Sequence, residues 1–154
     1  MLATTAPHDQ LRLAGRLQPP APAWSLHVPE PTVLIAEDDE SVRDLMAFKL
    51  ENAGYRTLTA DNGNSALALV HRADPDLIVL DVGMPGMDGL SVCHQLHSDR
   101  ITAQIPVIIV SGRTHQTDID LGYTVGADHY MNKPFNPADL VQRVRWLLMT
   151  GGQA

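Results

Sequence analysis

The chain has little that ties it to a membrane or to an oxidising compartment. It contains a single cysteine, Cys93, so it can form no internal disulfide and lacks the paired cysteines of a zinc site. Its longest aliphatic runs, residues 77–80 and 107–110, are far shorter than the roughly 20 apolar residues that a membrane-spanning helix needs. No basic cluster followed by an apolar stretch marks the N-terminus for secretion. A length of 154 residues suits one domain with a buried core. Together with the lack of a leader and of a membrane span, it leads us to expect a single cytoplasmic domain with no membrane contact.

The chain is also poor in positive charge. Its formal net charge is −7, and residues 1–31 contribute nothing to it because their two basic and two acidic side chains balance. The acidic excess therefore belongs to residues 32–154. A body of that sign repels the phosphates of nucleic acids, so we expect no direct binding of DNA or RNA, and instead a protein or metal-ion partner.

Prolines are concentrated at the start of the chain, where the first 31 residues hold six of the eleven. No hydrophobic period accompanies them, so we expect a disordered or extended arm over residues 1–31. The alternative is a short helical turn around Leu11, Leu13 and Leu17 that docks on a partner, but helices so short are marginal in isolation. At the other end, residues 151–154 are expected to form a short tail.

From Thr32 onward, short apolar runs alternate with segments of helical spacing. The expected strands are residues 32–36, 55–60, 76–80, 106–110 and 128–131. The expected helices are residues 42–53, 65–72, 89–97 and 114–125, and one that begins at Asn136. Such alternation predicts a parallel sheet with helices on both faces, because each crossover must be right-handed. The sequence therefore indicates one α/β domain over residues 32–150.

Residues at the helix ends support these assignments. Gly54 is a suitable stop for the first helix, Asp88 is expected to cap the third, and Pro137 suits the first turn of the last. The segment 114–125 is the weakest, because Gly122 interrupts it and poor helix formers end it. We expect that helix to be short or mobile.

Polar side chains follow the strands at what should be one edge of the sheet. Ligands of parallel α/β sheets bind beyond the carboxyl ends of the strands, near the point where strand order reverses. The residues in those places are Glu37, Asp38 and Asp39 after the first strand, Asp81 after the third, Ser111 and Gly112 after the fourth, and Lys133 after the fifth. Carboxylates this close raise one another's pKa unless a cation lies among them. We therefore expect a hard divalent ion such as Mg²⁺.

With the metal in place, Asp81 is the candidate nucleophile, because a carboxylate can accept a phosphoryl group as an acyl phosphate. Lys133 would supply a positive charge for a phosphate oxygen, and Ser111 would supply a hydrogen-bond donor. Phosphoryl transfer needs little beyond such positioning and charge neutralisation.

Four short motifs in a fixed order resemble those of response regulator receiver domains. They are E-D-D at 37–39, D-V-G-M-P-G-M-D-G at 81–89, S-G at 111–112 and K-P-F at 133–135. The resemblance covers nearly all of residues 32–150. It implies a flavodoxin-like, doubly wound sheet of five parallel strands in the order 2-1-3-4-5 with five helices. It also implies a phosphoacceptor switch of two-component signalling rather than an enzyme, phosphorylated by a sensor histidine kinase or a phosphotransfer protein.

The resemblance further implies how the acidic residues act. Asp81 would be the phosphoacceptor. Mg²⁺ would be bound by Asp81, by Asp38 and by the backbone carbonyl of Gly83, with Glu37 acting mostly through water. Asp39 stands where the first helix starts, so we favour a capping role for it over metal binding.

For the remaining site residues the resemblance implies contacts to the phosphoryl group and a switch. Ser111 would bond a phosphoryl oxygen and Lys133 would pair with the phosphoryl group. Tyr130 would turn inward behind Ser111. The peptide bond before Pro134 would be cis and would aim Lys133 at the site.

Two positions near the phosphoryl group are particular to this chain. Gly83 leaves water free access to the acyl phosphate, whereas Arg113 shields it or pairs with it, and the sequence leaves open which effect sets its lifetime. An aspartyl phosphatase is the enzyme alternative, but those enzymes carry a second acid where this chain has Gly83. A pseudo-receiver that binds its partner without phosphorylation is disfavoured by the complete acidic set, Ser111 and Lys133.

Other chemistry-bearing side chains have simpler interpretations. Cys93, His94 and His97 lack a fourth ligand at suitable spacing, so they indicate a solvated helix face with Cys93 as half-buried filler. His129 is isolated and is expected to be exposed.

The last helix offers a surface for output. Trp146 lies on its polar side, so it either forms a contact surface or lies across a neighbouring helix. We expect the output face to comprise the helix at 114–125, the strand at 128–131 and the last helix, with Asp128, Asp139, Arg143 and Trp146 at the interface. A homodimer through this face is one expectation. The residues after the last helix are too few for an output domain, so the downstream protein is expected to be a separate, unknown partner.

Overall fold

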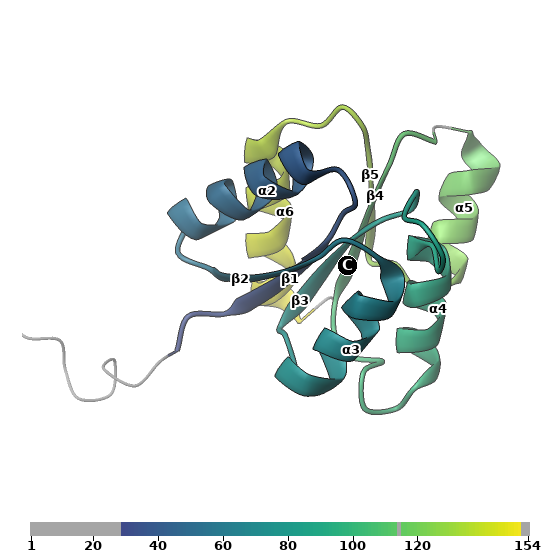
Figure 1. Ribbon diagram of the computed structural model, residues 1–154, viewed down its shortest axis with the longest axis horizontal. Coiled ribbons are helices and arrows are strands. Elements are labelled where there is room, and N and C mark those ends of the chain that lie inside the picture. The colour runs from purple at the N-terminus through teal and green to yellow at the C-terminus, as the bar shows by residue number, and fades with distance from the viewer. Residues whose placement is uncertain (1–28, 114, 152–154) are drawn as a thin grey trace, which may run out of the picture.

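The structure, a computed structural model, describes residues 29–113 and 115–151 (Figure 1). The expectations about residues 1–28 and 152–154 lie outside this part. Five strands form one sheet: β1 (Thr32–Ala36), β2 (Arg56–Ala60), β3 (Leu77–Asp81), β4 (Val107–Ser111) and β5 (His129–Asn132). The helices between and after them are α2 (Glu40–Asn52), α3 (Gly63–Ala73), α4 (Gly89–Ser98), α5 (Gln116–Thr124) and α6 (Pro137–Thr150).

The sheet is parallel throughout, with strand order β2-β1-β3-β4-β5. This order and the five helices confirm the predicted flavodoxin-like fold. The chain leaves β1 to form β2 on one side and then returns to place β3 on the other side of β1. The carboxyl ends of β1 and β3 therefore flank the point where strand order reverses, which is where such sheets bind ligands.

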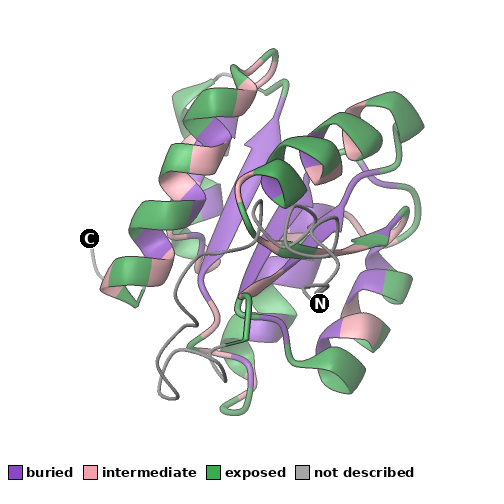
Figure 2. Cartoon of the chain, turned by 90° about the vertical axis from the view of Figure 1, so that its left-hand side faces the viewer, coloured by how far each residue is buried: buried purple, intermediate pink, exposed green. Residues whose placement is uncertain are grey.

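Helices cover both faces of the sheet, as Figure 2 shows by its central layer of buried strands. One face packs on α2 and α6 and the other on α3, α4 and α5. Because successive strand residues point to opposite faces, Val33 and Ile35 face α2 and α6 while Leu34 and Ala36 face α3 and α4. Cys93 of α4 is fully buried on the face covered by α3, α4 and α5, so the expectation of half burial was wrong.

Strands β3, β4 and β5 end one residue later than the sequence indicated. Asp81 and Ser111 are the last residues of β3 and β4, and they pair in register with Val110 and Asn132. Both side chains are therefore buried and fixed by the sheet rather than carried on loops. This pairing makes the edge of the sheet a rigid support for the site.

The helix ends follow their capping residues. The Asp88 side chain accepts a hydrogen bond from the Ser91 backbone and caps α4, as predicted. Pro137 lies in the first turn of α6, as predicted, and the Asn136 side chain caps that helix. α3 begins at Gly63, earlier than expected, because the Asn62 side chain accepts from the Ser65 backbone. α5 has nine residues, fewer than any other described helix, and no side chain caps its start, which confirms the prediction of a short helix.

Candidate functional site

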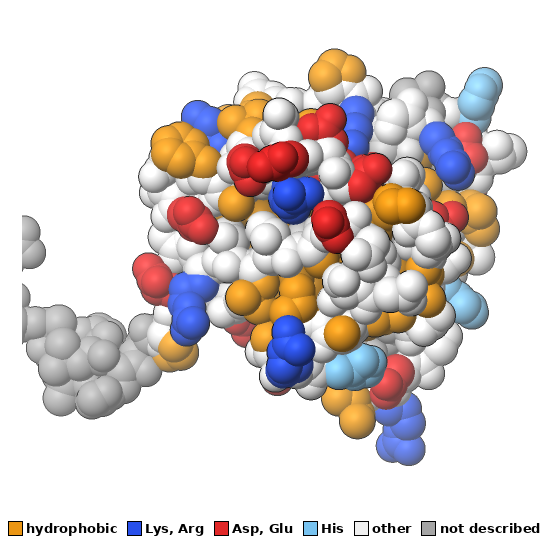
Figure 3. Space-filling model, in the orientation of Figure 1, with side chains coloured by type: hydrophobic (Ala, Val, Ile, Leu, Met, Phe, Trp, Pro, Cys, Tyr) orange, Lys and Arg blue, Asp and Glu red, His pale blue; other side chains and the backbone are white. Residues whose placement is uncertain are grey.

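Three carboxylates meet at the carboxyl ends of β1 and β3. One oxygen each from Glu37, Asp38 and Asp81 lies within 4.8 Å of the other two. Figure 3 shows acidic side chains gathered on the upper part of this face of the molecule. Glu37 and Asp81 are buried and Asp38 is exposed, so the cluster is open to solvent on one side. Oxygen donors of this kind are the ligands that Mg²⁺ prefers, and the donor set fits the predicted ion.

Lys133 brings a positive charge into this cluster from the end of β5. Its Nζ donates to Glu37 Oε1 at 2.8 Å and to Asp81 Oδ1 at 3.1 Å. Its backbone N–H donates to the Ser111 carbonyl at 2.8 Å, which anchors the lysine to the neighbouring strand. The Lys133–Pro134 peptide bond is cis, as predicted.

Glu37 is the most enclosed acid of the site, with no exposed surface. Its Oε1 accepts from Lys133 and its Oε2 accepts from the Asp39 backbone N–H at 3.1 Å. Arg43 donates to the Glu37 carbonyl at 3.0 Å and holds the backbone in place. Burial raises the pKa of Glu37 to about 7, although the Lys133 hydrogen bond opposes the shift.

The pKa of Lys133 is raised as well. Burial alone would lower the pKa of Lys133, but its hydrogen bonds to Glu37 and Asp81 outweigh burial and raise it. Glu37 and Lys133 thus both hold protons more tightly than usual. The cluster is short of positive charge, and a divalent cation would supply it.

Asp39, the third acid of the E-D-D motif, serves the helix instead. Its Oδ1 accepts from the Val42 backbone N–H at 3.1 Å and caps the start of α2. The carboxylate cluster comprises Glu37, Asp38 and Asp81 without it. The predicted capping role of Asp39 is confirmed.

Glycines shape the loop that follows Asp81. A Cβ at Gly89 would lie 2.3 Å from the Asp81 carbonyl oxygen, so no side chain fits there. Gly86 has a φ of +73°, a conformation that favours glycine. At Gly83 a Cβ would stand 3.8 Å from Asp81 Oδ2, in ordinary contact, so a side chain at 83 would line the approach to that oxygen. Glycine leaves this approach open.

A chain of hydrogen bonds links Ser111 to Tyr130 through the backbone of Arg113. Ser111 Oγ accepts from the Arg113 N–H at 2.9 Å, and the Tyr130 hydroxyl donates to the Arg113 carbonyl at 2.9 Å. Tyr130 is only 8% exposed, so its side chain already lies inward in this structure. The sequence named both side chains but missed the link through the Arg113 backbone, because no residue type signals a backbone contact.

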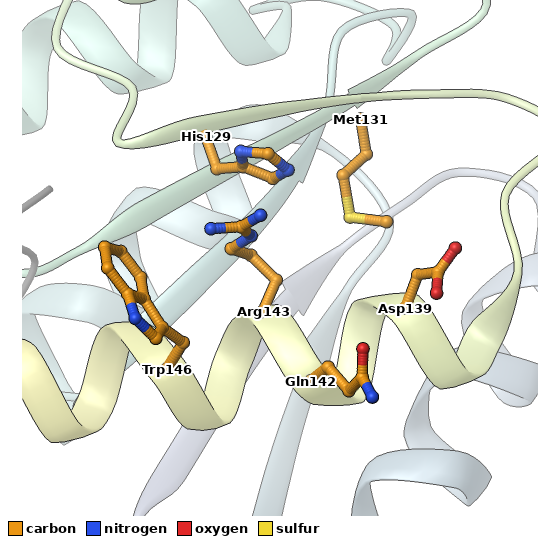
Figure 4. Close-up of a pocket in the computed structure, with 6 residues that line it drawn as sticks. All are labelled: His129, Met131, Asp139, Gln142, Arg143 and Trp146. Atoms are coloured by element: carbon orange, nitrogen blue, oxygen red, sulfur yellow. The ribbon is translucent and has the colours of Figure 1, made fainter.

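Three of the four predicted output residues, Asp139, Arg143 and Trp146, line a cavity of about 540 Å³ between β5 and α6 (Figure 4). His129 and Met131 line it from β5, and Asp139, Gln142, Arg143 and Trp146 from α6. Trp146 is 39% exposed, and the Arg143 guanidinium lies 5.4 Å from its ring centroid. The opposite side of α6 carries the buried Leu140, Val144 and Leu147, as the helical spacing predicted.

Two residues of this region are half-buried. His129 is half-buried, which corrects the expectation of an exposed side chain, and burial followed by the Arg143 charge lowers its pKa. Asp128 is also half-buried, and its Oδ2 accepts from the Val107 backbone N–H at 2.8 Å. Burial raises the pKa of Asp128. The hydrogen bond from Val107 gives this carboxylate a structural role in addition to its predicted place at the interface.

No helix in the described part of the chain is both long and apolar enough to cross a membrane.

Comparison with known proteins decides the family. Residues 33–145 match the response regulator receiver domain. The chain belongs to this family. Members of the family are signalling switches of two-component systems rather than classical enzymes.

Individual relatives agree with this assignment. The chain is 40% identical over 121 residues to the sensory transduction protein RegX3 of Mycobacterium tuberculosis H37Rv, which covers 79% of the chain and 52% of the relative. It is 41% identical over 118 residues to the DNA-binding dual master transcriptional regulator RpaA of Synechocystis, covering 77% and 49%. The solved receiver domain of the Francisella response regulator 1452 superposes with a TM-score of 0.75 at 35% identity, covering 79% of this chain and 98% of that one.

The chain spans about half the length of the curated relatives it matches. One of these is named as a DNA-binding regulator, so the expectation that this protein binds no nucleic acid stays a prediction.

Proposed function

We propose that this receiver domain accepts a phosphoryl group on Asp81 in a Mg²⁺-dependent reaction and passes the signal on through a change in Ser111 and Tyr130. The observation that carries the proposal is the cluster itself. Glu37, Asp38 and Asp81 converge within 4.8 Å, and the Lys133 ammonium bridges two of them. Two of the three acids are buried, and the charged groups converge from the ends of three different strands.

Asp38, Asp81 and the Gly83 carbonyl would hold the ion, and Glu37 would act mostly through water. Both oxygens of Glu37 are already engaged by Lys133 and by the Asp39 backbone, which supports an indirect role. When bound, Mg²⁺ would neutralise charge on the phosphoryl oxygens.

The chemical step needs only a nucleophile and its positioning. An oxygen of Asp81 attacks phosphorus, a new P–O bond forms, and the bond from phosphorus to the donor breaks with its electron pair leaving on the donor. Lys133 moves its hydrogen bond from Asp81 to the phosphoryl group, and Ser111 donates to a phosphoryl oxygen. Hydrolysis then breaks the P–O bond to Asp81 by attack of water, which the open approach at Gly83 admits.

The switch follows from the Arg113 link. When Ser111 turns to the phosphoryl group, its Oγ loses the hydrogen bond from the Arg113 N–H. The Arg113 backbone can then shift, and with it the carbonyl that accepts from the Tyr130 hydroxyl. Since the ring lies inward in this structure, phosphorylation would stabilise an existing arrangement rather than create one.

The donor would be a sensor histidine kinase or a phosphotransfer protein. Output would pass through the face formed by α5, β5 and α6, either to an unknown downstream protein or to a second copy of this chain. Asp128, Asp139, Arg143 and Trp146 are the residues proposed for that contact. The acidic surface argues against direct contact with nucleic acid.

Phosphorylation by acetyl phosphate tests the proposal. We expect the wild-type chain to gain one phosphoryl group in the presence of Mg²⁺ and none after chelation with EDTA. Asp81→Asn should not be labelled, because an amide is not a nucleophile of this kind. Equal labelling of the Asn variant, or labelling independent of Mg²⁺, would contradict the assignment.

A further inference from the structure

The inward position of Tyr130 depends on a residue of another element. α5 packs chiefly on β5, at the outer edge of the molecule (Figure 1). Gly122 is buried in α5 and faces the Tyr130 ring. A Cβ at position 122 would lie 2.8 Å from Tyr130 Cδ2 and 3.1 Å from Cε2. Carbon atoms in contact normally stay roughly 3.5–4.0 Å apart, so the ring occupies the space that a side chain at 122 would need.

Other constraints on this ring leave it little freedom to move aside within the core. Its hydroxyl is bonded to the Arg113 carbonyl, and its backbone N–H donates to the Tyr123 hydroxyl at 3.2 Å. The third neighbour of the hypothetical Cβ, at 3.6 Å, is Ile109 of the central sheet. A methyl group at 122 therefore conflicts with the tyrosine ring and with nothing else at short range.

Glycine at 122 is unfavourable for the helix, and the close contact with the Tyr130 ring explains why a glycine is nevertheless present. It weakens a helix that is already short and lacks a side-chain cap, since alanine favours helix more strongly. Its φ is not positive, so the backbone conformation itself does not call for glycine. The absence of a side chain at 122 leaves room for the Tyr130 ring.

We propose that Gly122 is a positioning residue of the switch: it provides the seat for the Tyr130 ring, so that α5 and the inward tyrosine form one unit. The functional part of this inference rests on the proposed role of Tyr130 in the Asp81 switch. The packing part stands without phosphorylation.

The test compares Gly122→Ala with Thr117→Ala in the full chain. Both changes raise helix propensity within α5, but Gly122 is buried and Thr117 is exposed. Accessibility of Tyr130 is measured by nitration with tetranitromethane followed by peptide mass analysis, with Tyr55 in the connection between α2 and β2 as the internal reference.

We expect nitration of Tyr130 relative to Tyr55 to rise several-fold in Gly122→Ala and to stay at the wild-type level in Thr117→Ala. Unchanged nitration of Tyr130 in a folded Gly122→Ala protein would overturn the proposal. If Gly122→Ala does not fold, Gly122→Ala/Tyr130→Ala decides: recovery of the fold supports the seat, because the clash is gone, and failure to recover overturns it.

A parallel measurement separates this inference from the proposed function. Nitration is measured without any phosphodonor, and labelling by acetyl phosphate is measured on the same samples. Absence of label in the wild type would refute the proposed function but not the packing of Tyr130 against Gly122. With label present, beryllofluoride should further protect Tyr130 in the wild type and in Thr117→Ala, but not in Gly122→Ala; protection in all three would show that residue 122 does not govern the switch.

Discussion

The site around Asp81 and the face around Trp146 hold their charged side chains in different ways. At the site, Lys133 donates hydrogen bonds to both Glu37 and Asp81, and the three residues lie at the ends of strands far apart in the sequence. On the other face, Asp139 and Arg143 are one helical turn apart on α6, and neither has an ion-pair partner within the described residues.

The two arrangements suit two different functions, chemistry at the site and recognition on the other face. Chemistry requires groups fixed before the substrate arrives, because reorganisation would add to the barrier. Recognition leaves charged and aromatic groups available for a partner to pair and cover. Changes at the site should therefore affect labelling, and changes on the α5-β5-α6 face should affect association alone.

Removal of Lys133 should have the largest effect. Lys133→Ala leaves the buried Glu37 carboxylate without its cation, so we expect labelling of Asp81 to slow by about 10²-fold and the free energy of unfolding to fall by about 1–3 kcal/mol. The chain's only other lysine, Lys49, is exposed on α2 and gives the control Lys49→Ala. Rates of labelling by acetyl phosphate and urea unfolding measure both effects, and equal rates in the two variants would refute the role of Lys133.

The two neighbouring aspartates should separate metal binding from helix capping. Asp38→Ala removes a carboxylate of the cluster, so Mg²⁺ affinity should fall by about tenfold or more. Asp39→Ala should leave Mg²⁺ affinity near the wild-type value and cost about 1 kcal/mol of stability, because it removes the cap of α2. Metal titration followed by the intrinsic fluorescence and urea unfolding provide the readouts; similar losses of Mg²⁺ affinity would mean that the acids are misassigned.

A change at Trp146 should affect only association. We expect Trp146→Ala to weaken phosphorylation-dependent binding, to a partner or to itself, on the order of tenfold while labelling of Asp81 stays unchanged. Met149→Ala is the matched control, since Met149 is an exposed apolar side chain of α6 that does not line the cavity. Sedimentation with and without beryllofluoride measures self-association. A loss of labelling in Trp146→Ala would remove the distinction between the two regions.

The smallest effect concerns Asp128. Because burial raises its pKa, the folded state holds the proton more readily than the unfolded state. The resulting stabilisation is present below the unfolded pKa of about 3.9 and is lost as pH rises through the folded pKa. Asp128→Asn keeps an acceptor for the Val107 N–H and is neutral at every pH. Its stability relative to wild type should therefore improve from acid to neutral pH, by less than about 1 kcal/mol. Urea unfolding midpoints at several pH values test this sign.

The alternating pattern of the sequence predicted the parallel sheet and placed the helix ends within two residues, and the family resemblance supplied the strand order. Motif spacing also predicted that Glu37, Asp38, Asp81 and Lys133 would meet at one edge of the sheet. Asp88 caps the helix that it was expected to cap, and Pro137 lies in the first turn of the last helix, as expected. Burial across elements was harder to predict. Cys93 and His129 were placed too near the surface, since their exposure depends on how α4 and α6 pack on the sheet. The role of Gly122 is invisible in the sequence for the same reason, because its neighbour is a ring from β5.

The most direct test of the account is to locate the acyl phosphate. After labelling with acetyl phosphate and Mg²⁺, borohydride reduction converts an aspartyl phosphate to homoserine, which peptide mass analysis assigns to one residue. The account predicts homoserine at Asp81 alone, with Asp38 and Asp39 unchanged in the same sample. Homoserine at either of those two residues, or at none in a labelled protein, would contradict it.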